Sequence, residues 1–408
     1  MGAINMFNDF VKLIESESLP VEAVAIADGD AIIAERHFVP DQDRNIYSHT
    51  KSYVSTAIGI AIEDGLLSLD SRLVDSFPEY VPSDAQLELG QITLRHLLTM
   101  SSGFNHAYLM NPDRRSGVGA PDYLRYMFSR RVEVEPGSTF CYSSADSDLA
   151  GRMLEQAAGM RLGEYLYGMI FSKLDQGWPV WECDPQGHPI AGGGIYMSLA
   201  NMLKLGQVYL NDGTWHGTRI VSESWVKQAS GKQIDTPYSN IWTCGYGYQF
   251  WMTTHNGYAF LGMGGQLAVY YPDKDVILVT TADAQGRQGG VQLIYDAFYE
   301  EVYSRIDTCT DNGDYEEFQK FENSRQLLVQ PGEYSSDLVS KINGQSYEFG
   351  DNPCGVTDIK LTFNGDEGTF FYTNATGNHE LHFGLGKNVF QNFPDYNFKC
   401  GASAAFRA

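Results

Sequence analysis

The order of hydrophobic and polar residues predicts strands near both ends of the first 305 residues and helices between them. A helical period over residues 6–17 predicts an amphipathic helix, and two β-rich runs on either side of Asp28-Gly29-Asp30 predict a hairpin after it. From Thr50 to about residue 230 the pattern is mainly helical. Three strand patterns and one helical pattern follow, at residues 245–253, 258–271, 275–282 and 291–305. Strands that flank a helical insertion indicate an α/β protein of the α+β kind, with an antiparallel sheet covered by helices and a mostly helical second lobe.

A change of composition after residue 305 predicts a domain boundary. Residues 306–323 are polar and acidic, which is typical of a linker. Beyond them, short aromatic and β-branched runs alternate with Asn-Gly and Thr-Gly turns, which indicates an all-β module over residues 324–408, a small barrel, sandwich or lipocalin-like fold. We therefore expect a main domain over residues 1–305, a linker, and a small β-domain.

Charge narrows the range of partners. The 408 residues include 51 Asp and Glu but 28 Lys and Arg, which gives a formal net charge of −23. Such a surface repels nucleic acid and anionic membranes. No apolar run approaches the length of about 18 residues that spans a bilayer. We expect a small-molecule substrate, no nucleic acid and no membrane insertion, and the oligomeric state stays open.

The N-terminus and the cysteines bear on the compartment. The first residues lack a basic region followed by an apolar core, so no signal peptide is expected in this sequence. The six cysteines are scattered without a Cys-x-x-Cys pair, which favours reduced thiols. Both patterns favour a cytoplasmic protein, with a periplasmic or secreted location as the alternative if a signal peptide has been removed.

Ser48 and Lys51 form a Ser-x-x-Lys sequence at the start of a strongly periodic helix. At this spacing the two side chains share one helix face about a turn apart. A lysine half buried there would have a depressed pKa and could accept the serine proton at neutral pH. Taken alone, the pair fits a helix cap and a solvated lysine better than a catalytic pair. A second Ser-x-x-Lys, Ser224 to Lys227, has no tyrosine or glycine-rich strand arranged around it and is interpreted as an ordinary helix start.

Two further segments carry residues suited to this chemistry. Tyr142 lies in a loop just before an amphipathic helix, where a tyrosine can relay a proton between an attacking serine and a leaving group. Gly264-Gly265 lies in the run predicted as one strand over residues 258–271, and glycine inside a strand marks a close backbone approach. That approach would let a substrate carbonyl reach the N–H of Gln266. Each segment alone also fits a structural role, as a packed tyrosine or a β-bulge.

In series, these segments resemble the serine β-lactamase-like hydrolase superfamily of class C β-lactamases, penicillin-binding proteins, D-aminopeptidases, esterases and 6-aminohexanoate-dimer hydrolase. The resemblance covers roughly residues 5–305. Its three boxes appear in order, as Ser48-His49-Thr50-Lys51, Tyr142-Ser143-Ser144 and Met263-Gly264-Gly265. Accessory stretches also match, at residues 92–103, 191–198 and 245–251.

The resemblance implies a β-lactamase/transpeptidase-like fold, with a five-stranded antiparallel sheet and a helical lobe. It implies that Ser48 is the acylated nucleophile, that Lys51 and Tyr142 share general base and acid work, and that the backbone N–H groups of Ser48 and Gln266 form the oxyanion hole. The other box residues would line the substrate site: Met263, Gly264, Gly265 and Ser144. The implied mechanism needs no metal or cofactor, and the sequence contains neither a His-Glu-x-x-His motif nor a Gly-x-Ser-x-Gly elbow.

Two box residues depart from the lactam-active pattern. Met263 stands where lactamases and penicillin-binding enzymes carry a cation for the substrate carboxylate, and losing such a contact costs about 1.5–3 kcal/mol. Ser144 replaces the asparagine of the second box, and a hydroxyl offers fewer donors than an amide. Both changes favour neutral esters or linear amides over β-lactams, although Arg287 could substitute for the missing cation. We therefore predict a serine hydrolase that acts through an acyl-enzyme.

Two alternatives stay open. The first is another activity of the same superfamily: a D-aminopeptidase, a carboxypeptidase, or a protein with weak β-lactamase or penicillin-binding activity. The second belongs to another class, a catalytically idle protein whose cleft and β-module bind a ligand. All three catalytic side chains are present, which favours an enzyme.

Overall fold

The computed structural model describes residues 3–28, 31–40, 42–238, 244–306, 329–350, 352, 355–394 and 399–407. The chain divides into two compact units, Met1–Arg325 and Gln326–Ala408. Most of the predicted linker, residues 307–323, lies outside the described residues.

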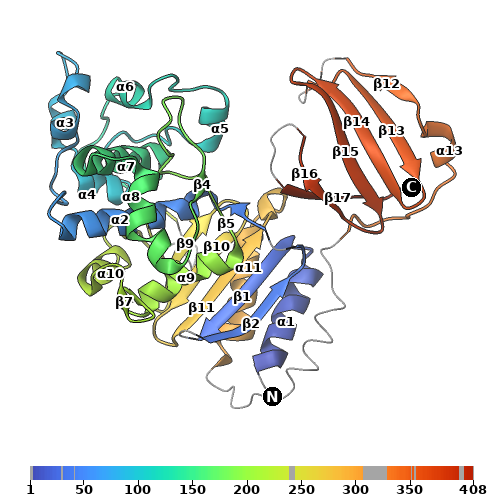
Figure 1. Cartoon of the computed structure of the whole chain (residues 1–408), viewed down its shortest axis with the longest axis horizontal. Helices are drawn as coiled ribbons and strands as arrows, with labels where there is room; N and C mark the ends of the chain where they lie inside the picture. Colours follow the sequence, from blue (N-terminus) through green and yellow to red (C-terminus); the bar gives the residue numbers. More distant parts are fainter. Residues whose placement is uncertain are drawn as a thin grey trace. The chain divides into compact units, whose positions relative to one another are not determined.

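A six-stranded sheet forms the centre of the first unit (Figure 1). Its strand order is β2-β1-β11-β10-β9-β8, and every neighbouring pair is antiparallel. The strands are β1 (Val21–Asp28), β2 (Ala31–His37), β8 (Trp251–Met252), β9 (Tyr258–Gly262), β10 (Gln266–Tyr271) and β11 (Val276–Ala282). This confirms the predicted antiparallel sheet, although only Trp251 and Met252 of the run predicted over residues 245–253 form a strand.

The run 258–271, predicted as one strand, forms two. Met263, Gly264 and Gly265 make the turn between β9 and β10, and the two glycines have φ angles of +83° and +103°. Residues with a Cβ rarely adopt these angles, so the glycine pair reverses the chain. The prediction was wrong because glycines within a β-rich run fit a hairpin turn as well as a strand.

Helices pack against this sheet and form the second lobe (Figure 1). The predicted first and last helices of the unit contact each other, as α1 (Ala3–Ser16) and α11 (Gly290–Phe298) with the π-helix Tyr299–Tyr303 that follows it. α9 (Leu199–Leu210) contacts β10 and β11. The other helices are α2 (Thr50–Glu63), α3 (Leu73–Ser76), α4 (Leu94–Leu98), α5 (Asn111–Arg115), α6 (Tyr123–Phe128), α7 (Ser144–Ala158), α8 (Leu162–Met169) and α10 (Glu223–Ala229).

α2 is the central helix of the lobe and contacts α7, α8 and α10. Its residues from Thr50 to Ala61 are all buried, so the apolar stripe seen in the sequence is only part of its buried surface. A helix buried on every side needs close neighbours on every side. Gly59 provides room for one of them, because a Cβ there would lie 2.4 Å from the Trp225 ring of α10.

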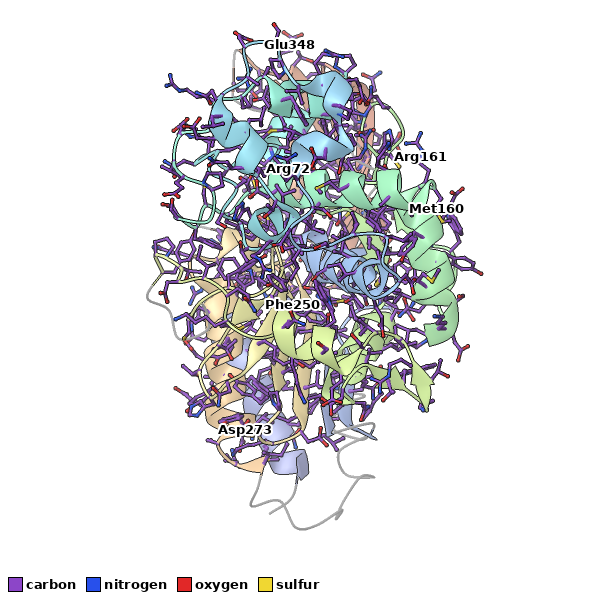
Figure 2. The ribbon with its side chains drawn as sticks, turned by 90° about the vertical axis from the view of Figure 1, so that its left-hand side faces the viewer. Arg72, Met160, Arg161, Phe250, Asp273 and Glu348 are labelled. Atoms are coloured by element: carbon purple, nitrogen blue, oxygen red, sulfur yellow. The ribbon has the colours of Figure 1, made fainter. Side chains whose placement is uncertain are left out.

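An aromatic core lies between the sheet and these helices. The Phe250 ring lies 4.8 Å from the rings of both Tyr209 and Phe260, and Figure 2 shows its side chain inside the unit. Phe260 in turn meets the His49 ring edge-on, with 5.1 Å between the centroids. The core therefore reaches the turn that precedes α2. Met160 and Asp273 are exposed at the surface.

Short strands complete the first unit. One small sheet has the order β3-β5-β4, and its members are β3 (Arg44–Asn45), β4 (Val180–Trp181) and β5 (Ile195–Met197). A hairpin pairs β6 (Thr214–Trp215) with β7 (Thr218–Arg219). A 3₁₀ turn, Tyr47–His49, connects β3 to α2. Among the described residues, no helix combines the length and the apolar character that a membrane crossing needs.

The second unit contains a six-stranded sheet of order β12-β13-β14-β15-β17-β16. Its neighbouring strands are antiparallel except for β15 and β17, which are parallel. The elements are α13 (Val339–Ile342), β12 (Ser346–Glu348), β13 (Asp358–Asn364), β14 (Glu367–Asn374), β15 (Gly377–Leu385), β16 (Val389–Asn392) and β17 (Lys399–Ala404). Tyr372, Phe383 and Leu385 are its most buried side chains.

Candidate active site

Ser48 lies in the 3₁₀ turn that leads into α2. The preceding Tyr47 has a φ angle of +47°, which is uncommon for a residue other than glycine, and its N–H donates to Asn45 Oδ1 at 2.8 Å. Behind the turn, His49 is buried with Nδ1 3.4 Å from the carbonyl oxygen of Gln266. Burial lowers the pKa of His49 to about 3. Its ring therefore stays neutral and supports the turn.

Lys51 brings its amine to the Ser48 hydroxyl. Its Nζ lies 3.0 Å from Ser48 Oγ and 3.5 Å from Ser144 Oγ, and it donates to the carbonyl of Gly192. The lysine is only 1% exposed. Burial lowers its pKa to about 7, although the Asp148 charge acts to raise it. At neutral pH much of the amine is therefore unprotonated and can accept the serine proton.

Tyr142 lies just before α7 and lines the same cavity as Ser48. Its ring lies 5.2 Å from Lys51 Nζ and 5.2 Å from the Trp251 ring. Burial raises the pKa of Tyr142 to about 12, so the phenol keeps its proton at neutral pH. It can therefore donate or relay a proton, whereas the partly unprotonated amine of Lys51 can accept one.

The third predicted box is divided between cavity and core. Met263 and Gly264 line the cavity beside Ser48, while Gly265 and Gln266 are absent from its lining. Gln266 begins β10, which lies between β9 and β11, and its side-chain amide donates to the Ala282 carbonyl. The Gln266 backbone nevertheless lies beside the Ser48 turn, since its carbonyl oxygen is the one that lies 3.4 Å from His49 Nδ1. The oxyanion role of its N–H stays a prediction.

The end of β9 also approaches the Ser48 turn. A Cβ on Gly262 would lie 2.1 Å from the carbonyl oxygen of Ile46, so only glycine permits the two backbones to pack this closely. Leu261 and Gly262 join Met263 in the cavity lining. The end of β9 and the start of the turn after it therefore lie beside Ser48.

The cavity has a volume of about 640 Å³, within the range of small-molecule sites. Its charged lining residues are Arg114, Glu182 and Arg287. Arg287 forms an ion pair with Glu17 at 2.8 Å, and Glu182 accepts a hydrogen bond from Asn45 Nδ2 at 2.9 Å. The cavity thus offers apolar walls with charges of both signs.

Sequence reasoning missed Arg114, Glu182 and Asp148. Arg114 lies in the short helix α5 and Glu182 directly follows β4, both far from Ser48 in the chain, and no pattern connects them to it. Asp148 could have been singled out from the sequence, because it lies among the buried residues of α7, one turn after Ser144. A carboxylate in such a position needs a partner.

Comparisons with known proteins agree with this geometry. The sequence matches the protein family described as Beta-lactamase over residues 8–296. It is 25% identical over 310 residues to the 6-aminohexanoate-dimer hydrolase of Paenarthrobacter ureafaciens, covering 68% of this chain and 78% of that protein. It is 30% identical over 150 residues to the lovastatin esterase of Penicillium rubens, covering 31% of this chain and 36% of that protein.

A solved structure shares the fold over both units. The octameric penicillin-binding protein homologue from Pyrococcus abyssi has a TM-score of 0.55 at 16% identity, covering 98% of this chain and 95% of that one. The family match, by contrast, rests on the sequence and spans well over half of the chain. The chain belongs to the Beta-lactamase family and is a hydrolase of the β-lactamase-like type.

Proposed function

We propose that this protein is a serine hydrolase that acts through an acyl-enzyme on neutral esters or linear amides. The supporting observation is the 3.0 Å distance between Lys51 Nζ and Ser48 Oγ, in surroundings where burial brings the lysine pKa to about 7. A serine becomes a nucleophile when an adjacent base can take its proton. The relatives named above include an esterase and a hydrolase of an amide dimer.

The proposed acylation uses all three side chains. Ser48 Oγ attacks the substrate carbonyl, and its proton passes to Lys51 Nζ. The bond to the leaving group breaks as Tyr142 donates its proton to that group and receives one from Lys51. A water molecule then attacks the acyl-enzyme ester, its proton returns to Ser48 by the same groups, and the acid product leaves.

The oxyanion hole of this proposal consists of the backbone N–H group of Ser48 together with that of Gln266, as the resemblance implies, or that of Met263. Met263 follows β9, whose last residue packs against the turn that carries Ser48, and it lines the cavity. A donor of this kind typically lowers the barrier by about 3 kcal/mol. Because the donor is a backbone group, the role does not depend on the Met263 side chain.

The cavity lining supports a neutral substrate. Met263 supplies no cation at the third box and is 41% exposed. Arg287 does lie in the lining, but its guanidinium is already paired with Glu17. An uncharged acyl group can therefore bind without leaving a buried charge uncompensated.

The test is a burst experiment with p-nitrophenyl acetate and p-nitrophenyl butyrate. We expect a burst of p-nitrophenolate from the wild-type protein and none from Ser48→Ala. A fluorophosphonate should add to Ser48, as located by mass spectrometry of peptides. A wild-type protein that gives neither burst nor adduct would instead be the idle ligand-binding protein.

A second candidate substrate class is an amide or peptide that carries a carboxylate. Arg114 also lines the cavity and, unlike Arg287, it is not paired with Glu17, so its guanidinium can hold a carboxylate. This would make the protein a D-aminopeptidase, a carboxypeptidase or a penicillin-binding enzyme. Covalent labelling by a fluorescent penicillin supports this class, and its absence alongside an ester burst favours neutral substrates.

A further inference from the structure

A buried carboxylate lies behind the lysine of the proposed site. Asp148 lies on α7 one helical turn after Ser144, and its Oδ1 accepts a hydrogen bond from the Gly192 N–H at 2.7 Å. The carbonyl of the same glycine accepts from Lys51 Nζ. Gly192 is therefore held on one side by the carboxylate and on the other by the amine.

Gly192 fits this place because it has no side chain. A Cβ on it would lie 2.8 Å from Ser144 Cβ, so any larger residue would separate the segment 191–194 from α7. The hydrogen bond that Gly192 donates to Asp148 thus fixes a residue whose carbonyl accepts from the Lys51 amine. Removing that bond would free the acceptor that orients Lys51 Nζ.

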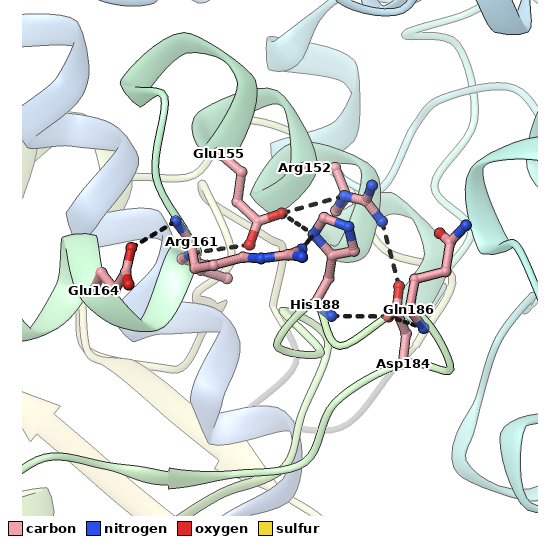
Figure 3. A network of polar contacts seen from close by, with 8 residues as sticks. Arg152, Glu155, Arg161, Glu164, Asp184, Gln186 and His188 are labelled. Carbon is pink, nitrogen blue, oxygen red and sulfur yellow. Dashed lines mark hydrogen bonds and ion pairs between the residues drawn. The ribbon is translucent and has the colours of Figure 1, made fainter.

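Asp148 has no competing cation on its own helix. Arg152, one turn further along α7, is already paired, with Nε 3.2 Å from Glu155 Oε2 and Nη1 3.3 Å from Asp184 Oδ2 (Figure 3). Among the described residues, Asp148 Oδ2 has no hydrogen-bond donor. The carboxylate charge is therefore not cancelled within α7 and acts on groups of neighbouring elements.

Several charged or titratable groups face this carboxylate. Lys51 on α2 and Arg114 on α5 favour its ionised form, and Asp184, in the segment between β4 and β5, opposes it. A cavity of about 20 Å³ beside Asp148 is also lined by Tyr123, Arg152 and His188, and His188 is in contact with Glu155. Burial raises the pKa of Asp148, and Lys51 and Arg114 act against that rise.

We propose that Asp148 is a positioning residue for Lys51, which anchors Gly192 against the amine and supplies the negative charge that lets a buried lysine hold a proton between its two transfers. This proposal rests on the acyl-enzyme function proposed above. A buried lysine without a compensating charge is a weak base, because its protonated form has lost its hydration. The nearby carboxylate compensates for part of that loss, so Lys51 can accept the serine proton and keep it until the leaving group needs it.

The test compares pH profiles of kcat/KM for p-nitrophenyl butyrate. Asp148→Asn keeps the acceptor for the Gly192 N–H but removes the charge, so protonated Lys51 is less stable. We expect the acid limb, which follows the loss of the Lys51 proton, to move to lower pH by about one unit or more, with the plateau lowered about tenfold. Asp148→Glu keeps the charge, so its limb should stay within a few tenths of a unit of the wild-type position.

The matched control is Asp146→Asn on the same helix. Asp146 is also a buried carboxylate, but it accepts from Ser102 Oγ at 2.8 Å and is not among the groups acting on Lys51. The acid limb of the Asp146→Asn pH profile should lie at the wild-type position. If folded Asp148→Asn keeps the acid limb of its pH profile at the wild-type position, the proposal is overturned. A shift of that limb to lower pH in folded Asp148→Glu also overturns it. Asp148→Glu is the deciding variant if the Asn protein does not fold. A wild-type protein without a Ser48 adduct overturns the proposed function instead, which keeps the two failures apart.

Discussion

Ser48 and Lys51 share their spacing with Ser224 and Lys227, but the two pairs lie in opposite surroundings. Lys51 is 1% exposed with its Nζ 3.0 Å from the serine hydroxyl. Lys227 is exposed and pairs with Glu223, while Ser224 Oγ accepts a hydrogen bond from Gln228 Nε2 at 3.0 Å. Burial lowers the pKa of Lys51 to about 7, whereas the Glu223 partner raises the pKa of Lys227.

The residues between each serine and its lysine explain the difference. In the second pair the middle residues, Trp225 and Val226, are buried, so the serine and lysine face outward. In the first, His49 and Thr50 are buried together with Lys51. A spacing of three places two side chains on one face of a helix, and the rest of the helix decides whether that face meets solvent or the interior.

Replacing each of the two serines by alanine is the test of this comparison with the largest expected effect. Ser48→Ala should lower kcat/KM for p-nitrophenyl butyrate by at least about 10⁴-fold, because no other group can form the ester intermediate. Ser224→Ala, its matched control, should leave kcat/KM unchanged. Equal activities for the two variants would remove the distinction between the pairs.

Replacing each of the two lysines by methionine should give the next largest effect on activity. Lys51→Met removes the proposed base, and we expect a loss of about 10²–10⁴ in kcat because a positioned base typically contributes that much. Lys227→Met removes an exposed ion pair and should keep full activity. Steady-state kinetics of both purified variants measures the contrast, and a Lys51→Met enzyme with wild-type kcat would assign the base elsewhere.

The pH dependence of the wild-type protein should report Lys51 and not Lys227. The reaction needs the unprotonated amine, so kcat/KM should be high above pH 7 and fall about tenfold for each pH unit well below it. The limb should appear near pH 7, where burial places the Lys51 pKa. Lys227→Met should show the same limb, and a profile flat down to pH 5 would contradict the assignment.

The smallest expected effect is on stability, and its sign is opposite to that on activity. The folded pKa of Lys51 lies below its unfolded value of 10.5, so the unfolded state binds protons more readily between pH 7 and 10.5. Lys51 therefore costs stability at and below pH 7, and the cost declines as pH rises towards 10.5. Lys51→Met should raise the free energy of unfolding at pH 6 by about 0.5–2 kcal/mol, as measured by urea titration.

Lys227→Met is the control for that measurement. Its amine is solvated in both the folded and unfolded states, so its loss should leave the urea midpoint nearly unchanged. A Lys51→Met protein less stable than wild type at pH 6 would show that the contacts of the amine outweigh its desolvation.

Elements with a strong hydrophobic period were predictable from the sequence. The helix over residues 6–17, the hairpin after it and the antiparallel sheet all match the structure, since their patterns reflect which face is buried. The family was also recognisable, because three short boxes in a fixed order are specific even when each is ambiguous alone. These features depend on residues close together in the chain or on their order.

The rest of the site depends on contacts between distant segments. Glycine pairs in β-rich runs do not reveal whether the chain turns, so the hairpin at Gly264 and Gly265 was missed. Arg114, Asp148 and Glu182 reach the site through α5, α7 and the end of β4, and such convergence has no signature in a single sequence. Tertiary packing, not local pattern, decided these positions.

The contact between Gly59 and Trp225 joins the two Ser-x-x-Lys helices physically. Because the indole lies where a Cβ of residue 59 would be, any larger residue at position 59 would push α2 and α10 apart. Ser48 lies in the turn that leads into α2, so we expect a displaced α2 to move Ser48 relative to the end of β9. The tryptophan inside the second copy of the motif therefore helps to hold the first copy in place, and a Gly59 substitution should lower activity although it changes none of the proposed catalytic residues.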